Sequence, residues 1–270
     1  MTSIKMLGTG NGGTLDLYNT CFVIENEQDV FLIDTGGSIE ILKRLKQSKI
    51  RLEDIKNIFI SHSHTDHILG LIWMFKRMSR MAKHGEIKEK INIYCNDVVY
   101  EAIKGVSSYV LPPTLIEAIY DITNFVILND GDKYPINGID YEFFDILAKG
   151  TKQFGFECNI EDNKFIFLGD EPLNPLLNER VRNADYVTHE AFCLDKEESI
   201  FHAYEKNHST ALSAAKTLNE LDVKNLILYH TEESHGNNRK KLYTEEAKSV
   251  FDGNIIVPDD LEIIKFSKEK

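Results

Sequence analysis

The sequence predicts an α+β protein in which two sheets are covered on their outer sides by helices. Short apolar runs typical of strands alternate with amphipathic helical patterns from end to end, without the strict alternation of a purely parallel sheet. No Pro-, Gly- or Ser-rich linker divides the 270 residues, and no internal repeat is visible. We therefore expect one domain that spans residues 1–270.

The composition is that of a folded, acidic protein. Hydrophobic residues make up 42% and charged residues 27%, and 43 acidic against 31 basic side chains give a net charge of −12. This mix excludes disorder as the main state, and no apolar stretch is long enough to predict a membrane partner. The acidity disfavours nucleic-acid phosphates outside a local basic patch. Four widely spaced cysteines and a start without a signal-peptide core predict a cytoplasmic protein without disulfides.

In the first half of the chain, short apolar runs typical of strands alternate with helical patterns. Ser38 can cap the first helix through its hydroxyl, and Gly105 is expected to stop the third. Pro112 and Pro113 break the chain before a further helix. We expect strands at residues 22–24, 30–33, 58–60 and 91–94, and helices at residues 38–49, 68–81 and 97–104 and from the prolines to residue 120.

From residue 125 the pattern changes to a β-meander, because turn sequences rich in Asp, Asn and Gly separate the apolar runs. Beyond Leu168, helical patterns again alternate with strands. We expect meander strands at residues 125–128, 141–147, 154–160 and 165–168, later helices near 175–182 and 210–221, and later strands at 186–188, 225–229 and 261–266.

The strongest functional signal is a run of four potential ligands in six positions, His62, His64, Asp66 and His67, directly after a buried-looking strand. In extended backbone, side chains two apart point the same way, so His62 and His64 can hold one ion together. Asp66 and His67 lie where the chain turns into a helix and can face a second ion. The spacing predicts a metal centre in preference to a solvated polar loop.

This run resembles the H-x-H-x-D-H signature of the metallo-β-lactamase superfamily, and the resemblance covers nearly the whole chain. Further matches are an opening turn with Gly8 and Gly10, an acidic turn with Asp34, a strand-end Asp170, and His230 after an apolar strand. All of them lie at strand ends in the pattern described above. The resemblance implies a four-layer αββα sandwich, the metallo-β-lactamase fold.

A closer resemblance is to ribonuclease Z and its relatives, a phosphodiesterase branch of this superfamily. That branch carries a His-Glu-Ala motif and a His-Ser-Thr motif between the bridging aspartate and the last histidine, and residues 189–191 and 208–210 match them. The alternatives are a packed strand-end residue for His189 and a helix-start residue without a catalytic role for His208.

The resemblance implies a role for each matched side chain. Asp170 would bridge two ions, because a carboxylate has two oxygens and its charge offsets the repulsion between the ions. Asp66 would also orient or deprotonate the attacking water, and His208, assisted by Glu190, would protonate the leaving oxygen. Asp34 and His189 would orient the ligands from behind. The implied ligands are His62 and His64 on the first ion and Asp66, His67 and His230 on the second.

Two departures from the ribonuclease Z pattern concern the first ion and the substrate. The third histidine expected before residues 154–156 is missing. The first ion would then be held by His62, His64, Asp170 and water, or by a further ligand that the sequence does not identify. Otherwise the first metal site would bind its ion weakly or stay empty. Lys149 could put a positive charge in that place for a substrate phosphate, or simply be solvated. Residues 149–170 leave no room for the arm with which transfer-RNA processors clamp their substrate, so precursor transfer RNA is not favoured.

The sequence thus predicts a metal-dependent hydrolase in which a divalent ion lowers the pKa of bound water to about 7 and supplies hydroxide. The favoured substrate is a phosphodiester in a small molecule or a short nucleic acid. The ligand set favours zinc, as one or two ions, with manganese or iron as alternatives. Two other functions stay open: hydrolysis of a thioester, lactone or other carboxylic ester, and ligand binding or regulation without turnover. A homodimer is compatible with the sequence.

Overall fold

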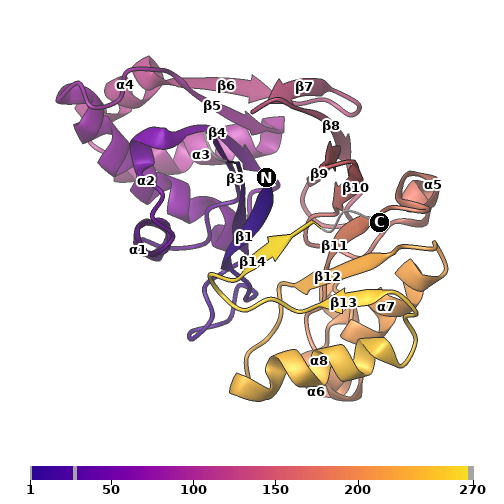
Figure 1. Ribbon diagram of the computed structural model, residues 1–270. Helices are drawn as coiled ribbons and strands as arrows, with labels where there is room; N and C mark the ends of the chain where they lie inside the picture. Colours follow the sequence, from indigo (N-terminus) through magenta and orange to yellow (C-terminus); the bar gives the residue numbers. More distant parts are fainter. Residues whose placement is uncertain (1, 27–28, 267–270) are drawn as a thin grey trace.

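Two seven-stranded mixed sheets pack face to face, and helices cover the outer side of each (Figure 1). The computed structural model describes residues 2–26 and 29–266. In the first sheet the strands follow the order β14 (Ile263–Lys265), β1 (Ser3–Gly8), β2 (Cys21–Glu25), β3 (Val30–Ile33), β4 (Ile55–Ile60), β5 (Ile91–Cys95) and β6 (Thr123–Ile127). In the second sheet they follow the order β13 (Asn254–Ile256), β12 (Asn225–Tyr229), β11 (Tyr186–Glu190), β10 (Asn163–Phe167), β9 (Phe154–Ile160), β8 (Ile139–Asp145) and β7 (Lys133–Ile136).

The helices separate into two outer layers, so the predicted α+β class and αββα sandwich are confirmed. The first sheet is covered by α1 (Glu40–Gln47), α2 (Thr65–Lys83), α3 (Asp97–Val110) and α4 (Pro113–Ile122), and the second by α7 (Ala211–Asn219) and α8 (Arg239–Lys248). Two single turns, α5 (Asn178–Val181) and α6 (Glu198–Phe201), lie in loops before and after β11. The single-domain assignment stays a prediction. No helix within residues 2–26 and 29–266 is long and apolar enough to cross a membrane.

Apolar side chains on both faces of the strands create three cores, which hold the four layers together. In β4, Ile58 and Ile60 pack under the helices, whereas Phe59 between them faces the second sheet, as the two-residue period of a strand requires. The core between the sheets is rich in aromatic rings, with Phe59 and Phe143 at 5.1 Å and Phe156 and Phe167 stacked at 5.4 Å. Each such pair contributes about 0.5–1.5 kcal/mol beyond its buried area.

Two expectations for the middle of the chain are wrong. Helix α3 continues through Gly105 to Val110, because its buried face recurs beyond the glycine at Ser107 and nothing crowds the half-buried glycine. Strand β6 does not begin the meander; it pairs in parallel with β5 at the edge of the first sheet. The meander starts instead with β7, and the predicted strands that became β8, β9 and β10 follow it.

Differences at two further elements have local causes. Helix α1 begins at Glu40 without a side-chain cap; the Ser38 hydroxyl accepts a hydrogen bond from the Glu40 amide at 3.2 Å instead of capping a longer helix. Helix α8 is missing from the expected elements because most of its residues are polar, and only Arg239, Tyr243 and Ala247 are buried. Its pattern therefore lacks the apolar stripe on which a helix prediction depends.

Parallel pairing brings several strand ends to one edge of the sandwich. Strands β3 and β4 are parallel in the first sheet, and β10, β11 and β12 are parallel in the second. The carboxyl ends of parallel strands meet at the same edge. Asp34 follows β3, His62 follows β4, Asp170 follows β10, and His230 follows β12. The backbone amide of Phe154 donates to the Ser61 carbonyl at 3.0 Å and ties the two sheets together at this edge.

We predict that Gly70→Ala destabilises the protein by about 1–3 kcal/mol, the cost of overpacking a core. A Cβ atom at Gly70 would lie 1.9 Å from the Thr35 carbonyl oxygen, where α2 packs against the turn after Asp34. The matched control is Gly105→Ala, which meets open space in a helix and is expected to stabilise by about 0.5–1 kcal/mol. Urea unfolding measures both. Equal effects of the two substitutions would contradict the close approach.

Candidate metal centre

Histidine and aspartate side chains converge at the edge where the strands end. The Asp170 carboxylate lies 3.3 Å from His62 Nε2, 3.4 Å from His67 Nε2 and 2.9 Å from His230 Nδ1. Asp66 faces the same space, with Oδ2 at 3.5 Å from His67 Nε2 and 3.4 Å from His230 Nε2. All five side chains belong to residues that are at most 9% exposed. They form two overlapping groups of potential ligands, His62–His67–Asp170 and Asp66–His67–His230.

Asp34 holds the loop that carries these ligands. Its carboxylate accepts hydrogen bonds from the Ser61 backbone amide at 2.8 Å and the Ser61 hydroxyl at 2.7 Å, and it lies 2.8 Å from His67 Nδ1. A carboxylate beside Nδ1 keeps the proton on that nitrogen and directs Nε2 of His67 toward Asp66 and Asp170. Asp34 sits in the left-handed backbone region, with φ 55°, a conformation that costs a non-glycine residue on the order of 1–3 kcal/mol.

The electrostatics of the cluster favour positive charge. Burial and the charge of His67 lower the pKa of His62 to about 4. Burial alone would also lower the pKa of His230, but Asp170 and Asp66 outweigh it and raise that pKa to about 9. The pKa of His67 is likewise raised against the effect of burial, by Asp66 first. Burial would raise the pKa values of Asp66 and Asp170, but the imidazoles around them hold both low. The buried carboxylates of Asp66 and Asp170 are therefore stabilised by positive charge beside them.

Unpaired atoms at the centre test whether a metal ion fits. Within the described part of the chain, His67 Nε2, Asp170 Oδ1 and His230 Nδ1 are buried without a hydrogen-bond partner. Asp170 Oδ1 and His230 Nδ1 are close but not aligned as donor and acceptor. Each unsatisfied buried group costs about 1–3 kcal/mol. Imidazole nitrogen and carboxylate oxygen are preferred ligands of Zn²⁺ and related ions, so the donor set fits a divalent cation.

The first group has fewer ligands than the ribonuclease Z pattern implies. His64 is exposed at the start of α2, with Nδ1 3.0 Å from His62 Nε2, and belongs to no group of three potential ligands among the described residues. In the loop where the third histidine would lie, the Lys149 and Gly150 amides donate to the Glu171 carboxylate at 2.7 and 3.1 Å. This loop is therefore anchored by its backbone and adds no ligand to those groups.

His208 lies beside the cluster, held by its neighbours. Its Nδ1 is 3.9 Å from Asp170 Oδ1 and 3.5 Å from Glu190 Oε2. Its ring lies nearly parallel to that of Phe192, with centroids 4.9 Å apart. Glu190 is fully buried and accepts a hydrogen bond from the Ser209 amide, which fixes the turn that presents His208. The arrangement places a second imidazole next to the aspartate, although His208, Asp170 and His230 also form a possible ligand group.

His189 points away from the ligands. Its Nε2 accepts a hydrogen bond from the Leu173 amide at 3.2 Å, so Nδ1 carries the proton and donates to the Glu190 carbonyl at 2.7 Å. Both ring nitrogens are thereby used within the protein. His189 connects the segment after Asp170 to the end of β11.

Two buried residues that sequence reasoning misses fix the turn of Asp170. The Gln153 side-chain oxygen accepts a hydrogen bond from the Asp170 amide at 3.2 Å, and the Tyr229 hydroxyl donates to the Gly169 carbonyl. Gly169 has φ 72°, a left-handed conformation that glycine adopts without strain. The Leu-Gly-Asp sequence signals the turn, whereas nothing local marks Gln153 or Tyr229 as its supports.

A cavity of about 270 Å³ opens beside His208, which forms one of its walls. Lys149, which is exposed, and Tyr204 and Asn207 also line it. His208 therefore both lines this cavity and lies 3.9 Å from Asp170, which brings the cavity next to the group of potential ligands.

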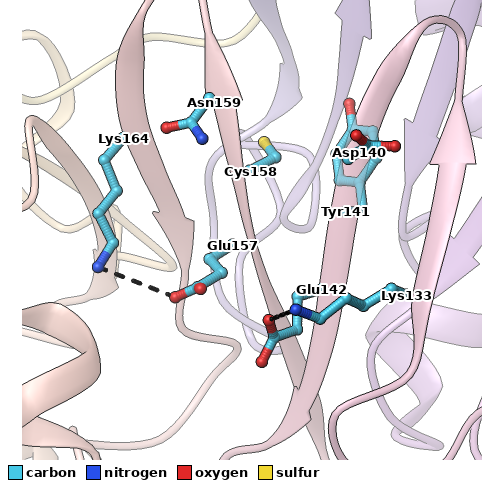
Figure 2. Close-up of a pocket in the computed structure, with 8 residues that line it drawn as sticks. All are labelled: Lys133, Asp140, Tyr141, Glu142, Glu157, Cys158, Asn159 and Lys164. Carbon is cyan, nitrogen blue, oxygen red and sulfur yellow. Dashed lines mark ion pairs between the residues drawn. The ribbon is translucent and has the colours of Figure 1, made fainter.

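Another cavity, of about 250 Å³, lies toward the opposite ends of β9 and β10 from Asp170 (Figure 2). Figure 2 shows two ion pairs in its lining, Lys133 with Glu142 and Lys164 with Glu157. Because both lysines of this cavity are already paired and the cavity is far along the strands from the histidines, we place the candidate functional site at the group of histidine and aspartate side chains.

The fold and the site define the class of the protein, a metal-dependent hydrolase of the metallo-β-lactamase superfamily, similar to ribonuclease Z. The chain is 26% identical to ribonuclease Z of Archaeoglobus fulgidus over 96% of both chains. It is 24% identical to ribonuclease Z of Bacillus subtilis, over 96% of this chain and 98% of that one. Among solved structures, the metallo-β-lactamase fold protein YhfI from Bacillus subtilis matches with a TM-score of 0.79 at 17% identity, covering 97% of this chain and 98% of the other.

Human tRNase Z, short form, has the same fold, with a TM-score of 0.72 and 20% identity over 98% of this chain and 100% of the other. The chain itself belongs to the family described as "Anti-Pycsar protein Apyc1", which matches residues 2–247. The matched segment includes every side chain of the metal cluster.

We predict that Asp34→Asn weakens divalent-metal binding about 10- to 100-fold, as loss of an orienting carboxylate behind a ligand does elsewhere. An amide cannot both accept from Ser61 as a carboxylate does and hold the proton on His67 Nδ1. Competition with a chromophoric chelator measures the affinity. Asp54→Asn, which removes the same charge from an exposed position, is the control. Equal affinities of the two variants would contradict the role of Asp34.

Proposed function

We propose that this protein is a phosphodiesterase that hydrolyses a phosphodiester in a small molecule or a short nucleic acid. The observation that carries the proposal is the place of His208, which lines a cavity of about 270 Å³ and whose Nδ1 lies 3.9 Å from Asp170 Oδ1. Hydrolysis of a phosphodiester expels an alkoxide, which needs a proton from a positioned acid. A thioester expels a thiolate, which has much less need of a proton. The fixed His208 imidazole therefore favours a phosphodiester substrate.

The metal cofactor would be held mainly by Asp66, His67, Asp170 and His230, with His62 beside His67 at the same Asp170 oxygen. When bound, a divalent cation supplies positive charge that lowers the pKa of water and offsets the charge of a phosphate. Zinc is our proposal, because imidazole and carboxylate groups provide the ligands; manganese and iron are the alternatives.

The remaining steps fall to residues of this chain. Asp66 faces the space between His67 and His230, where its free oxygen can orient a water molecule and accept its proton. His208 would give a proton to the leaving oxygen, and Glu190, buried and 3.5 Å from its Nδ1, would orient the ring. The parallel Phe192 ring limits rotation of the imidazole, which keeps the proton donor on the cavity side.

The lining of the cavity combines one cation, Lys149, with the Glu171 carboxylate, whose two oxygens already accept hydrogen bonds from the Lys149 and Gly150 amides. Lys149 places a cation where the resemblance leads one to expect a third histidine, and Tyr204 exposes 52% of its surface nearby, so its ring can pack against an aromatic or sugar group. Strands β9 and β10 and the turn between them take up residues 154–167, which leaves no clamp of the kind used for precursor transfer RNA. Four buried free cysteines support a cytoplasmic location as part of the proposal.

We predict that His208→Ala lowers kcat for a cyclic nucleotide about 100- to 10,000-fold, the contribution of a general acid. The same variant should hydrolyse bis-p-nitrophenyl phosphate at a rate within about tenfold of the wild type, because nitrophenolate leaves without a proton. Metal content, measured by elemental analysis, should stay unchanged. An equal loss on both substrates accompanied by loss of metal would make His208 a ligand; thioester or lactone turnover without phosphodiester turnover would sink the proposal.

We predict that Lys149→Gln raises KM for the phosphodiester by about tenfold, with little change in kcat, because a charged hydrogen bond contributes about 1.5–3 kcal/mol. Lys152→Gln is the matched control, since Lys152 is three residues away and pairs with Asp97 at 2.8 Å. Steady-state kinetics distinguish the two variants. A KM for Lys149→Gln equal to that of the control would mean that Lys149 is only solvated.

A further inference from the structure

A second group of potential metal ligands lies outside the site described above. It consists of Glu197, at the end of the 3-10 turn η3 (Asp195–Glu197), and of Glu232 and His235 in the loop after β12. His235 Nε2 is 2.9 and 3.0 Å from the two Glu197 oxygens and 4.0 Å from Glu232 Oε1. One ligand atom from each side chain lies within 4.8 Å of the others.

Glu232 is the residue that points to a ligand. It is 5% exposed, and its Oε1 atom, which faces His235, is buried without a hydrogen-bond partner among the described residues. Its other oxygen accepts from the Ser234 amide. One imidazole faces two carboxylates here and its Nε2 already meets Glu197, so the cluster is net negative even when His235 is protonated. A buried carboxylate in that state is costly unless a cation joins it.

Arg239, a buried cation near this loop, directs its hydrogen bonds to residues other than these three. The buried Arg239 guanidinium donates instead to the Thr231 hydroxyl, the Pro258 carbonyl and the Asp259 carboxylate. Burial raises the pKa of Cys193 to about 12, and Glu197 and Glu232 contribute to the same direction. The three side chains are therefore a negatively charged, partly buried group of potential ligands with one imidazole donor.

We propose that Glu197, Glu232 and His235 bind one transition-metal dication of the zinc type, separate from the catalytic centre. The imidazole donor favours Zn²⁺ over Mg²⁺ or Ca²⁺, which prefer all-oxygen sites. Three protein ligands leave a position for water. The side chains of His235 and Glu197 are 21% and 15% exposed, so an ion can enter from solvent.

This ion would connect two segments that carry residues of the catalytic centre. The loop of Glu232 begins directly after His230, and the Glu232 amide donates to the Phe192 carbonyl at 2.8 Å. Phe192 in turn packs its ring on His208. A cation shared by Glu197 and Glu232 would fasten this loop to residues 192–197. It would thereby help to position His230 and His208 without touching a substrate.

The test is the number of zinc ions per chain, counted by elemental analysis after equilibration of the full-length protein with excess Zn²⁺ and removal of loosely held metal. The variants are Glu232→Gln and His235→Ala, with Glu198→Gln as the control because it removes one charge from the residue next to Glu197. We expect the wild type and Glu198→Gln to hold one zinc more per chain than the other two. Zinc should also raise the melting temperature of the wild type and of Glu198→Gln by more than that of the other two variants, because binding of an additional ion stabilises the folded state by mass action.

The same zinc content in all four proteins would overturn the proposal, as would loss of every ion in Glu232→Gln and His235→Ala, which would make the group part of the catalytic centre. His235→Ala changes a partly exposed side chain, so it keeps the test decisive if Glu232→Gln does not fold. The count involves no substrate; it therefore stands or fails separately from the phosphodiesterase proposal.

Discussion

The burial of two carboxylates among three imidazoles is the constraint on which the site depends. Asp170 is 4% exposed and faces His62, His67 and His230 at once, and Asp66 faces two of the same rings. Removing such charges from water is costly unless positive charge joins them. Protons on the imidazoles supply it in the metal-free protein, and a divalent cation supplies it more completely. The cost of burying these charges is therefore the physical reason why the proposed site binds a metal ion.

The sandwich meets this constraint by bringing strand ends together. Parallel pairing in both sheets directs Asp34, Asp170 and His230 to one edge, and the aromatic core between the sheets keeps that edge closed. Asp34 and His230 both adopt left-handed backbone, with φ 55° and 56°, which costs on the order of 1–3 kcal/mol each. Strain of this kind persists where surrounding packing fixes the chain, and here the fixed conformation aims ligands at a common point.

The sequence was most informative where the chemistry is local. The run from His62 to His67 holds its ligands in six positions, so spacing alone indicates a metal, and the resemblance to ribonuclease Z adds the distant Asp170 and His230. Pairing between distant segments is not written in any local pattern, which is why the local pattern assigns β6 to the meander although it pairs with β5. For the same reason, the anchoring of the Lys149 loop by Glu171 depends on two loops meeting in space. Glu232 likewise looks like an ordinary surface residue until burial reveals its unpaired oxygen.

The most direct test of the central claim is anomalous X-ray scattering from crystals of the protein grown with zinc. The account predicts a strong peak at bonding distance, about 2.0–2.2 Å, from His67 Nε2, from a ring nitrogen of His230 and from carboxylate oxygens of Asp66 and Asp170. Absence of a peak there, with these side chains turned away from one another and paired elsewhere, would contradict it.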